Sequence, residues 1–257
     1  PKDFKNEIRR IQIIQLSELA QMPLHVISHN DIAAFLHSLQ VQRNLAKATV
    51  NRYRSRISAI MNYALDEEYV LSNPVKKIKK YKEKPRTRAL TVYEINSLLD
   101  ACRASKNREL YTIVVLALNT GMRKGEILSI KECNVNIKNR NIYLERSYTK
   151  SGESRWVPLN DAAADVLGAY MACSDGPRLF KSKCIRNAFE GAMYKAGIEQ
   201  ARFHDLRRTF ATHLKDGGIS LHTIMHLLGH SSISMTERYL ATQDTILFDV
   251  VAKIDFN

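Results

Sequence analysis

The stretch "KKIKKYKEKPRTR" at residues 76–88 divides the chain into two parts. Eight of its thirteen residues are basic, one is acidic and one is proline. A segment this short and this charged cannot form a core of its own, so we expect a linker or strap between two folded parts. The prediction is therefore a first domain at 1–75, a basic linker at 76–88 and a second domain at 89–257.

The charge of the chain indicates a polyanionic partner. Lys and Arg number 39 against 26 Asp and Glu in 257 residues, a formal net charge of +13. Nucleic acid is the first candidate and an acidic membrane surface is the rival. Residues 1–88 hold 17 basic and 8 acidic residues, net +9, whereas 89–257 hold 22 and 18, net +4. The linker is thus expected to follow a DNA backbone through Lys76, Lys77, Lys79, Lys80, Lys82, Lys84, Arg86 and Arg88.

Several function classes are disfavoured by composition. The longest near-unbroken apolar run, "YTIVVLAL" at 111–118, is far short of the ~20 residues of a membrane span, and the N-terminus lacks the apolar region of a signal peptide. We expect an intracellular, cytoplasmic protein with no membrane partner. The four cysteines form no C-x-x-C pair, which argues against a zinc site and a disulfide framework. Because the first residue is Pro1, removal of an upstream domain stays open.

The part before the linker has the pattern of a small all-helical domain. Apolar residues recur at helical spacing in 49–67 behind the expected N-cap Thr49, and shorter helical patterns cover 7–20 and 31–39. The Asn73-Pro74 pair predicts the end of this domain. The face of the long helix that carries Arg52, Arg54 and Arg56 is either an ordinary solvated surface or a surface that contacts phosphates.

The part after the linker predicts a mainly helical domain with a small antiparallel sheet. Thr91 and Glu94 have the spacing of a capping box. Strand-like runs at 135–137, 141–149 and 154–159 are separated by "KNRN" and "KSGE", which are typical of hairpin turns. The helical patterns cover 92–103, 108–119, 161–172, 182–196, 205–216, 220–228, 233–240 and 244–253.

Four segments of this second part carry residues suited to one reaction. They are "NTGMRKGEIL" (119–128), "YTKSGESRWVPL" (148–159), "FHDLRRTFATHL" (203–214) and "LGHSSISMTERYL" (228–240). Transesterification at a phosphodiester without a metal needs guanidinium groups on the phosphate oxygens, a nucleophile and a proton donor for the leaving hydroxyl. Tyr239 suits the role of nucleophile and Lys150 that of proton donor.

These segments resemble the motifs of the tyrosine recombinases, or phage integrases. "TGMRKGE" is similar to the motif of the first arginine, here Arg123, with Glu126 as the supporting acid. "TKSGESRWVPL" resembles the hairpin of the catalytic lysine, Lys150. "HDLRRTFATHL" resembles the H-x-x-R box of His204 and Arg207. "LGHSS" resembles the box of the second histidine, His230, with the nucleophile Tyr239 nine residues later.

The resemblance implies a C-shaped clamp around double-stranded DNA, formed by a helical, SAM-like core-binding domain and an α+β catalytic domain. Tyr239 would form a 3′-phosphotyrosine and release a 5′-hydroxyl, without ATP, metal or any other cofactor. Four protomers would act through a Holliday junction, with accessory DNA-bending proteins as further partners. The segment 245–256 would form a helix that docks on a neighbouring protomer or packs on its own.

Three other functions compete with this interpretation. A metal hydrolase is suggested by His222, His226 and His230, although Thr223 stands where a zincin would have Glu. A catalytically silent DNA-binding protein would have no use for the hydroxyl group of Tyr239. A type IB topoisomerase shares the chemistry but relaxes DNA instead of exchanging partners.

Overall fold

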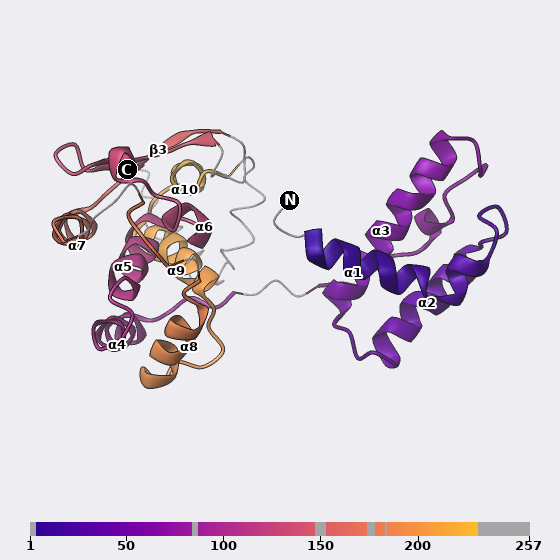
Figure 1. The fold of residues 1–257 in the computed structure, drawn as a ribbon, viewed down its shortest axis with the longest axis horizontal. Helices are drawn as coiled ribbons and strands as arrows, with labels where there is room; N and C mark the ends of the chain where they lie inside the picture. The colour runs from indigo at the N-terminus through magenta and orange to yellow at the C-terminus, as the bar shows by residue number, and fades with distance from the viewer. Residues whose placement is uncertain (1–3, 84–86, 147–152, 174–177, 183, 231–257) are drawn as a thin grey trace, which may run out of the picture. The chain divides into compact units, whose positions relative to one another are not determined.

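The computed structural model describes residues 4–83, 87–146, 153–173, 178–182 and 184–230 (Figure 1). The chain divides into two compact units, Pro1–Lys84 and Pro85–Asn257. The division falls inside the segment 76–88. Within the described residues, no helix has both the length and the apolar character that crossing a membrane requires.

Unit 1 is helical, and its helices α2 and α3 supply most of its core. Ile32, Leu36 and Leu39 of α2 pack with Val50 and Ile57 of α3. Its elements are α1 (Phe4–Gln15), η1 (Glu18–Gln21), α2 (His29–Val41), α3 (Lys47–Asp66) and η2 (Pro74–Lys77).

The expected N-cap Thr49 is wrong. Helix α3 begins three residues earlier than expected, at Lys47, and Ala46 holds the cap position in an extended conformation while its carbonyl accepts from Val50 N at 3.1 Å. The first turn therefore forms without a side-chain cap, so a capping signal could not locate it.

Residues 75–82, which we call the strap, pack against unit 1. Val75, Ile78 and Tyr81 recur every three residues and face the core of this unit. Asn51 on α3 holds the strap by donating to Tyr81 O (2.9 Å) and accepting from Tyr81 N (2.9 Å). Arg54 Nε donates to Ile78 O (2.8 Å) and its Nη2 to Val75 O (3.0 Å). The strap lysines are exposed, namely Lys76, Lys77, Lys79, Lys80 and Lys82.

Unit 2 is built around helix α5, in which eight of eleven residues are buried. Figure 1 shows α5 among the helices of this unit, and it packs against α4, α7 and α9. Its helices are α4 (Val92–Arg103), α5 (Leu110–Thr120), α6 (Lys124–Ile127), η3 (Glu132–Asn134), α7 (Asp161–Met171), α8 (Arg186–Lys195), α9 (Phe203–Asp216) and α10 (Leu221–Leu228).

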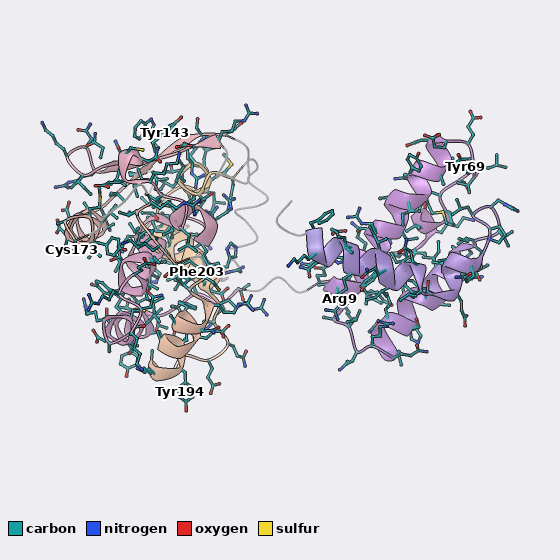
Figure 2. All side chains as sticks on the ribbon, viewed as in Figure 1. Arg9, Tyr69, Tyr143, Cys173, Tyr194 and Phe203 are labelled. Atoms are coloured by element: carbon teal, nitrogen blue, oxygen red, sulfur yellow. The ribbon has the colours of Figure 1, made fainter. Side chains whose placement is uncertain are left out.

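The predicted antiparallel sheet is present in unit 2. Strands β1 (Val135–Asn136), β2 (Asn141–Leu144) and β3 (Arg155–Pro158) lie in the order β1-β2-β3, and all pairs are antiparallel. Ile142, Leu144 and Val157 face the core. On the other face Tyr143, labelled in Figure 2, lies beside Trp156 with ring centroids 4.9 Å apart. The alternation of inward and outward side chains thus follows the period of a half-buried sheet.

The predicted capping box at the start of α4 is also confirmed. The Thr91 side chain accepts from Glu94 N (3.2 Å), and the Glu94 carboxylate accepts from Thr91 N (2.9 Å). The helices predicted at 233–240 and 244–253 lie outside the described residues.

Candidate active site

The first part of the site is formed where α5 ends. Gly121 adopts a left-handed conformation (φ 63°) that terminates α5, and Arg123 then caps the short helix α6. Glu126 on α6 accepts from Arg123 N (2.8 Å) with one carboxylate oxygen and from Arg123 Nη1 (2.9 Å) with the other. Glu126 is 2% exposed. The acid therefore fixes both the backbone and the guanidinium of Arg123, as its predicted supporting position requires.

A second guanidinium, which sequence reasoning missed, holds the same carboxylate. Arg155 on β3 donates from Nη2 to Glu126 Oε2 (3.0 Å) and from Nη1 to Glu126 Oε1 (3.3 Å). Burial raises the pKa of Glu126, but the bonds from Arg155 and Arg123 outweigh it, so this pKa lies below its usual value. One signal could have revealed the pair. Arg155 shares the inward face of β3 with Val157, and a buried arginine requires an acid partner.

Arg207 on α9 is buried, with 1% of its surface exposed. Its Nη1 donates to Gly121 O (2.7 Å), beyond the end of α5, and its Nη2 donates to Leu228 O (2.7 Å) at the end of α10. The carboxyl end of a helix carries partial negative charge, so both ends favour a cation. The backbone of two helices thereby sets the position of this guanidinium.

His230 lies directly against Arg207. Gly229 ends α10 in a left-handed conformation (φ 61°), and His230 N donates to Met225 O (3.0 Å). The His230 ring is buried, and its Nε2 lies 2.7 Å from Arg207 Nη2. Loss of hydration and the charges of Arg207 and Arg123 lower the pKa of His230 to about 3. The ring is thus neutral at pH 7, and Nε2 accepts the hydrogen bond because a guanidinium can only donate.

His204 opens onto a hollow of about 570 Å³ at the start of α9, which begins at Phe203, labelled in Figure 2. His204 is exposed, yet partial loss of hydration and the charges of Arg207 and Arg208 lower its pKa. The hollow is also lined by three basic residues that sequence reasoning did not select, Lys124, Arg186 and Arg202. No motif marks these three, because their proximity depends on the packing of α6, α8 and α9.

Five predicted site residues thus gather in unit 2. They come from three segments of the chain, and they are Arg123, Glu126, His204, Arg207 and His230. The other two, Lys150 and Tyr239, lie outside the described residues, although Lys150 falls by sequence in the connection between β2 and β3.

The histidines weighed for a metal site do not converge. His222 and His226 contact each other through their Nε2 atoms at 3.0 Å on the exposed face of α10, whereas His230 contacts Arg207. In the part of the chain that the structure describes, no group of three His, Cys, Asp or Glu residues could hold a metal ion.

The predicted DNA-contacting residues differ in their surroundings. Arg52 is exposed, Arg54 binds the strap, and Arg56 pairs with Glu7. Arg88 pairs with Glu94 in unit 2. The strap lysines point to solvent, and Lys84 and Arg86 lie outside the described residues. Their contacts with DNA stay a prediction.

The sequence and fold were compared with known proteins. The model of the phage integrase family matches residues 88–245. The integrase of Salmonella phage P22 is 30% identical over 229 residues, which cover 82% of this chain and 58% of that protein. The tyrosine recombinase XerD of Caulobacter vibrioides is 29% identical over 240 residues, which cover 84% of this chain and 77% of that protein.

Solved structures show the same fold. A lambda integrase dimer bound to a COC′ core site matches with a TM-score of 0.78 and 25% identity over 95% of this chain and 89% of that one. The Tn1549 transposon integrase in complex with a circular intermediate DNA matches with a TM-score of 0.85 and 17% identity, over 98% of this chain and 94% of that one.

Proposed function

Since the chain belongs to the phage integrase family, we propose that it is a site-specific DNA recombinase that cleaves and rejoins strands through Tyr239. The observation that carries this proposal is the contact of the buried Arg207 with a neutral His230, beside Arg123 and His204. A fixed positive group next to the unprotonated imidazole of His230 suits the charge that develops on a phosphate under attack. The proposed transesterification uses no redox group and no nucleotide cofactor.

The two arginines are proposed to hold the scissile phosphate. In the transition state, negative charge grows on the non-bridging oxygens as the tyrosine oxygen approaches phosphorus. Guanidinium groups that are already in position stabilise this charge without reorganisation. Glu126 orients Arg123 and two backbone carbonyls orient Arg207, which favours phosphate binding in a preset geometry.

The histidines and Lys150 are proposed to move protons. The Tyr239 hydroxyl transfers its proton to the imidazole of His204 or His230, and its oxygen forms a bond to phosphorus. The bond from phosphorus to the 5′-oxygen breaks, and that oxygen takes a proton from the Lys150 ammonium. The product is a 3′-phosphotyrosine and a 5′-hydroxyl. A 5′-hydroxyl of a partner duplex then reverses the step, and the ester bond conserves the energy needed for ligation.

Recombination requires the two units to act on one duplex. We infer that residues 1–75 form the core-binding domain, that 76–88 follow the backbone, and that 89–257 form the catalytic domain of a C-shaped clamp. The solved lambda integrase is bound to a core site as a dimer. For this chain we propose a DNA-bound tetramer that passes through a Holliday junction, with the segment 245–256 as a contact between protomers. Accessory DNA-bending proteins would assist assembly.

The test is capture of a covalent adduct on a nicked duplex. The recombination site is first selected by binding from a pool of random duplexes, and a nick next to the scissile phosphate then prevents religation. The expected result is a protein–DNA adduct in the wild type and none in Tyr239→Phe. Tyr194→Phe is the matched control, since Tyr194 is 88% exposed on α8. An adduct with Tyr239→Phe refutes the assignment of the nucleophile.

Two further measurements separate the alternatives. Cleavage that is lost in EDTA supports a metal hydrolase, and binding without cleavage supports a silent DNA-binding protein. Strand exchange between two labelled duplexes is expected of a recombinase, whereas relaxation of supercoiled DNA without exchange indicates a type IB topoisomerase.

A further inference from the structure

We propose that Arg155 is a positioning residue for the reaction: it shares the carboxylate of Glu126 with Arg123 so that Arg123 keeps a net positive charge toward the phosphate. This inference rests on the proposed function. It assigns a role to a residue of β3 that is not among the arginine, lysine, histidine and tyrosine residues predicted for catalysis.

Among the contacts of the described residues, the Glu126 carboxylate binds two cations, Arg123 and Arg155. Arg155 engages both oxygens of Glu126 with two parallel bonds, at 3.0 and 3.3 Å. Arg123 uses one guanidinium nitrogen, at 2.9 Å, and its backbone nitrogen, at 2.8 Å. The Arg155 side chain is 14% exposed and that of Arg123 is 18% exposed. Glu126 is therefore held by two cations in a site that water enters little.

The charges explain why the sharing matters. Two guanidiniums and one carboxylate leave a net charge of +1 at the site. Without Arg155, the carboxylate and Arg123 form a pair whose charges cancel, and burial keeps water from solvating the carboxylate instead. A neutral pair attracts a phosphate less and stabilises its transition-state charge less than a cation does. Arg155 thus acts on the reaction through Glu126 and Arg123, with no contact to the reacting atoms.

The turn after α10 is shaped to admit Arg155. A Cβ atom on Gly229 would lie 2.9 Å from Arg155 Cζ and 2.9 Å from Arg155 Nε. The left-handed conformation of Gly229 also disfavours any other residue. The Arg155 guanidinium therefore packs against the turn at Gly229, which precedes His230, and it also binds Glu126, which orients Arg123. A group with only a structural role on β3 would not need this close approach to two parts of the site.

The test compares Arg155→Gln, Arg155→Lys and Lys131→Gln on the nicked duplex. Lys131→Gln is the matched control, because Lys131 pairs with a different carboxylate, that of Glu145 directly after β2. Cleavage rate at saturating DNA and the DNA Kd are measured separately. For Arg155→Gln we expect cleavage ~10- to 100-fold slower, as for a displaced positioning group, with a Kd within about 3-fold of wild type. Lys131→Gln should cleave like wild type.

Arg155→Lys keeps the charge but cannot form two parallel bonds, so we expect cleavage ~3- to 10-fold slower than wild type and faster than Arg155→Gln. If thermal melting shows that Arg155→Gln is unfolded at the assay temperature, Arg155→Lys decides alone. A Lys variant that cleaves at the wild-type rate overturns the proposal, as does an Arg155→Gln variant whose whole defect lies in Kd.

Lys150 lies five residues before Arg155 in the chain. A second substrate therefore distinguishes an effect of Arg155 on Arg123 from an effect on the placement of Lys150. In this duplex sulfur replaces the scissile 5′-oxygen. A thiolate leaves without a proton donor, so defects in Lys150 vanish on this substrate while defects in charge stabilisation persist. We expect the slow cleavage of Arg155→Gln to persist, and its recovery to the wild-type rate refutes the route through Arg123. If the wild type forms no adduct on either substrate, the proposed function itself is refuted, and not only the role of Arg155.

Discussion

Replacing Gly121 by alanine should both destabilise unit 2 and displace Arg207, which donates to Gly121 O. A Cβ atom at this position would lie 2.5 Å from Phe210 Cδ1 and 2.7 Å from Leu228 Cδ2. Leu228 is fully buried, so its side chain has little free space into which it can move. The left-handed backbone of a non-glycine residue costs about 1–2 kcal/mol, and overpacking of a core costs about 1–3 kcal/mol. The expected loss in free energy of unfolding is therefore ~2–5 kcal/mol.

The single tryptophan of the chain, Trp156, lies on β3 and reports on unit 2 alone. Urea unfolding followed by its fluorescence gives the free energy of unfolding, and adduct formation gives the effect on Arg207, which donates to Gly121 O. Gly191→Ala is the control. Gly191 lies in α8, and its Cβ would meet no atom within 4 Å. This control should gain ~0.5–1 kcal/mol because alanine favours the helix.

The predicted clash at Gly121 is refuted if Gly121→Ala lowers the free energy of unfolding by less than about 1 kcal/mol. The Gly191→Ala control must behave as expected in the same experiment. It would mean that α5, α9 and α10 can separate slightly at no cost. A stable variant with normal adduct formation would further show that Arg207 tolerates displacement of its backbone acceptor.

Three other outcomes are expected. The His230 ring should stay neutral in NMR spectra of the DNA-free protein down to about pH 3. Below pH ~6.5 the unfolded chain binds this proton and the folded chain does not, so the free energy of unfolding should fall by up to ~1.4 kcal/mol for each unit by which the pH is lowered from ~6.5 to about 3. His230→Gln should remove that slope. Arg54→Ala should cost unit 1 ~1–3 kcal/mol and expose the strap to proteolysis, because Ile78 O loses its Arg54 donor and Val75 O keeps only the bond from Ile78 N. Exposed Arg52→Ala should leave stability unchanged, and weaker DNA binding by a fully stable Arg54→Ala protein would count against this role. DNA binding of the full chain should weaken steeply with salt, and Lys79→Gln should reduce the slope of log K against log salt by about 1, so a slope unaffected by this change excludes Lys79 from the phosphate contacts.

The helices of unit 2 could be predicted because local signals and packing agree there. The capping box of Thr91 and Glu94 marks the first residue of α4, and the apolar run at 111–118 marks α5. The four-residue helix α6 was missed because it has no room for a periodic pattern. Its existence depends on Gly121 ending α5 and on Glu126 capping Arg123, which are contacts rather than periodicities.

The site was predicted as a set of residue types, but its electrostatics were not. Arginine is usually exposed, whereas Arg207 is buried and donates to the carbonyls of Gly121 and Leu228 at the ends of α5 and α10, which no sequence pattern reveals. The neutral state of His230 likewise depends on its neighbours. Arg155 lay in a strand that had been predicted, yet the acid that it binds is 29 residues away in the chain. The strap was expected to be a linker because its many lysines hide the apolar residues Val75, Ile78 and Tyr81, which recur every three positions and pack on unit 1.

The two carbonyls that hold Arg207 have a consequence for redirecting the protein to new DNA sites. Side chains can be exchanged by mutation, but a main-chain carbonyl is retained whatever residue carries it. Substitutions on the exposed face of α10 can therefore accumulate while the Arg207 guanidinium keeps its acceptors. Libraries that vary exposed positions such as Arg52 and the strap lysines leave this pair of acceptors untouched. We expect such libraries to yield altered target preference with an unchanged rate of strand cleavage, which separates selection for recognition from selection for chemistry.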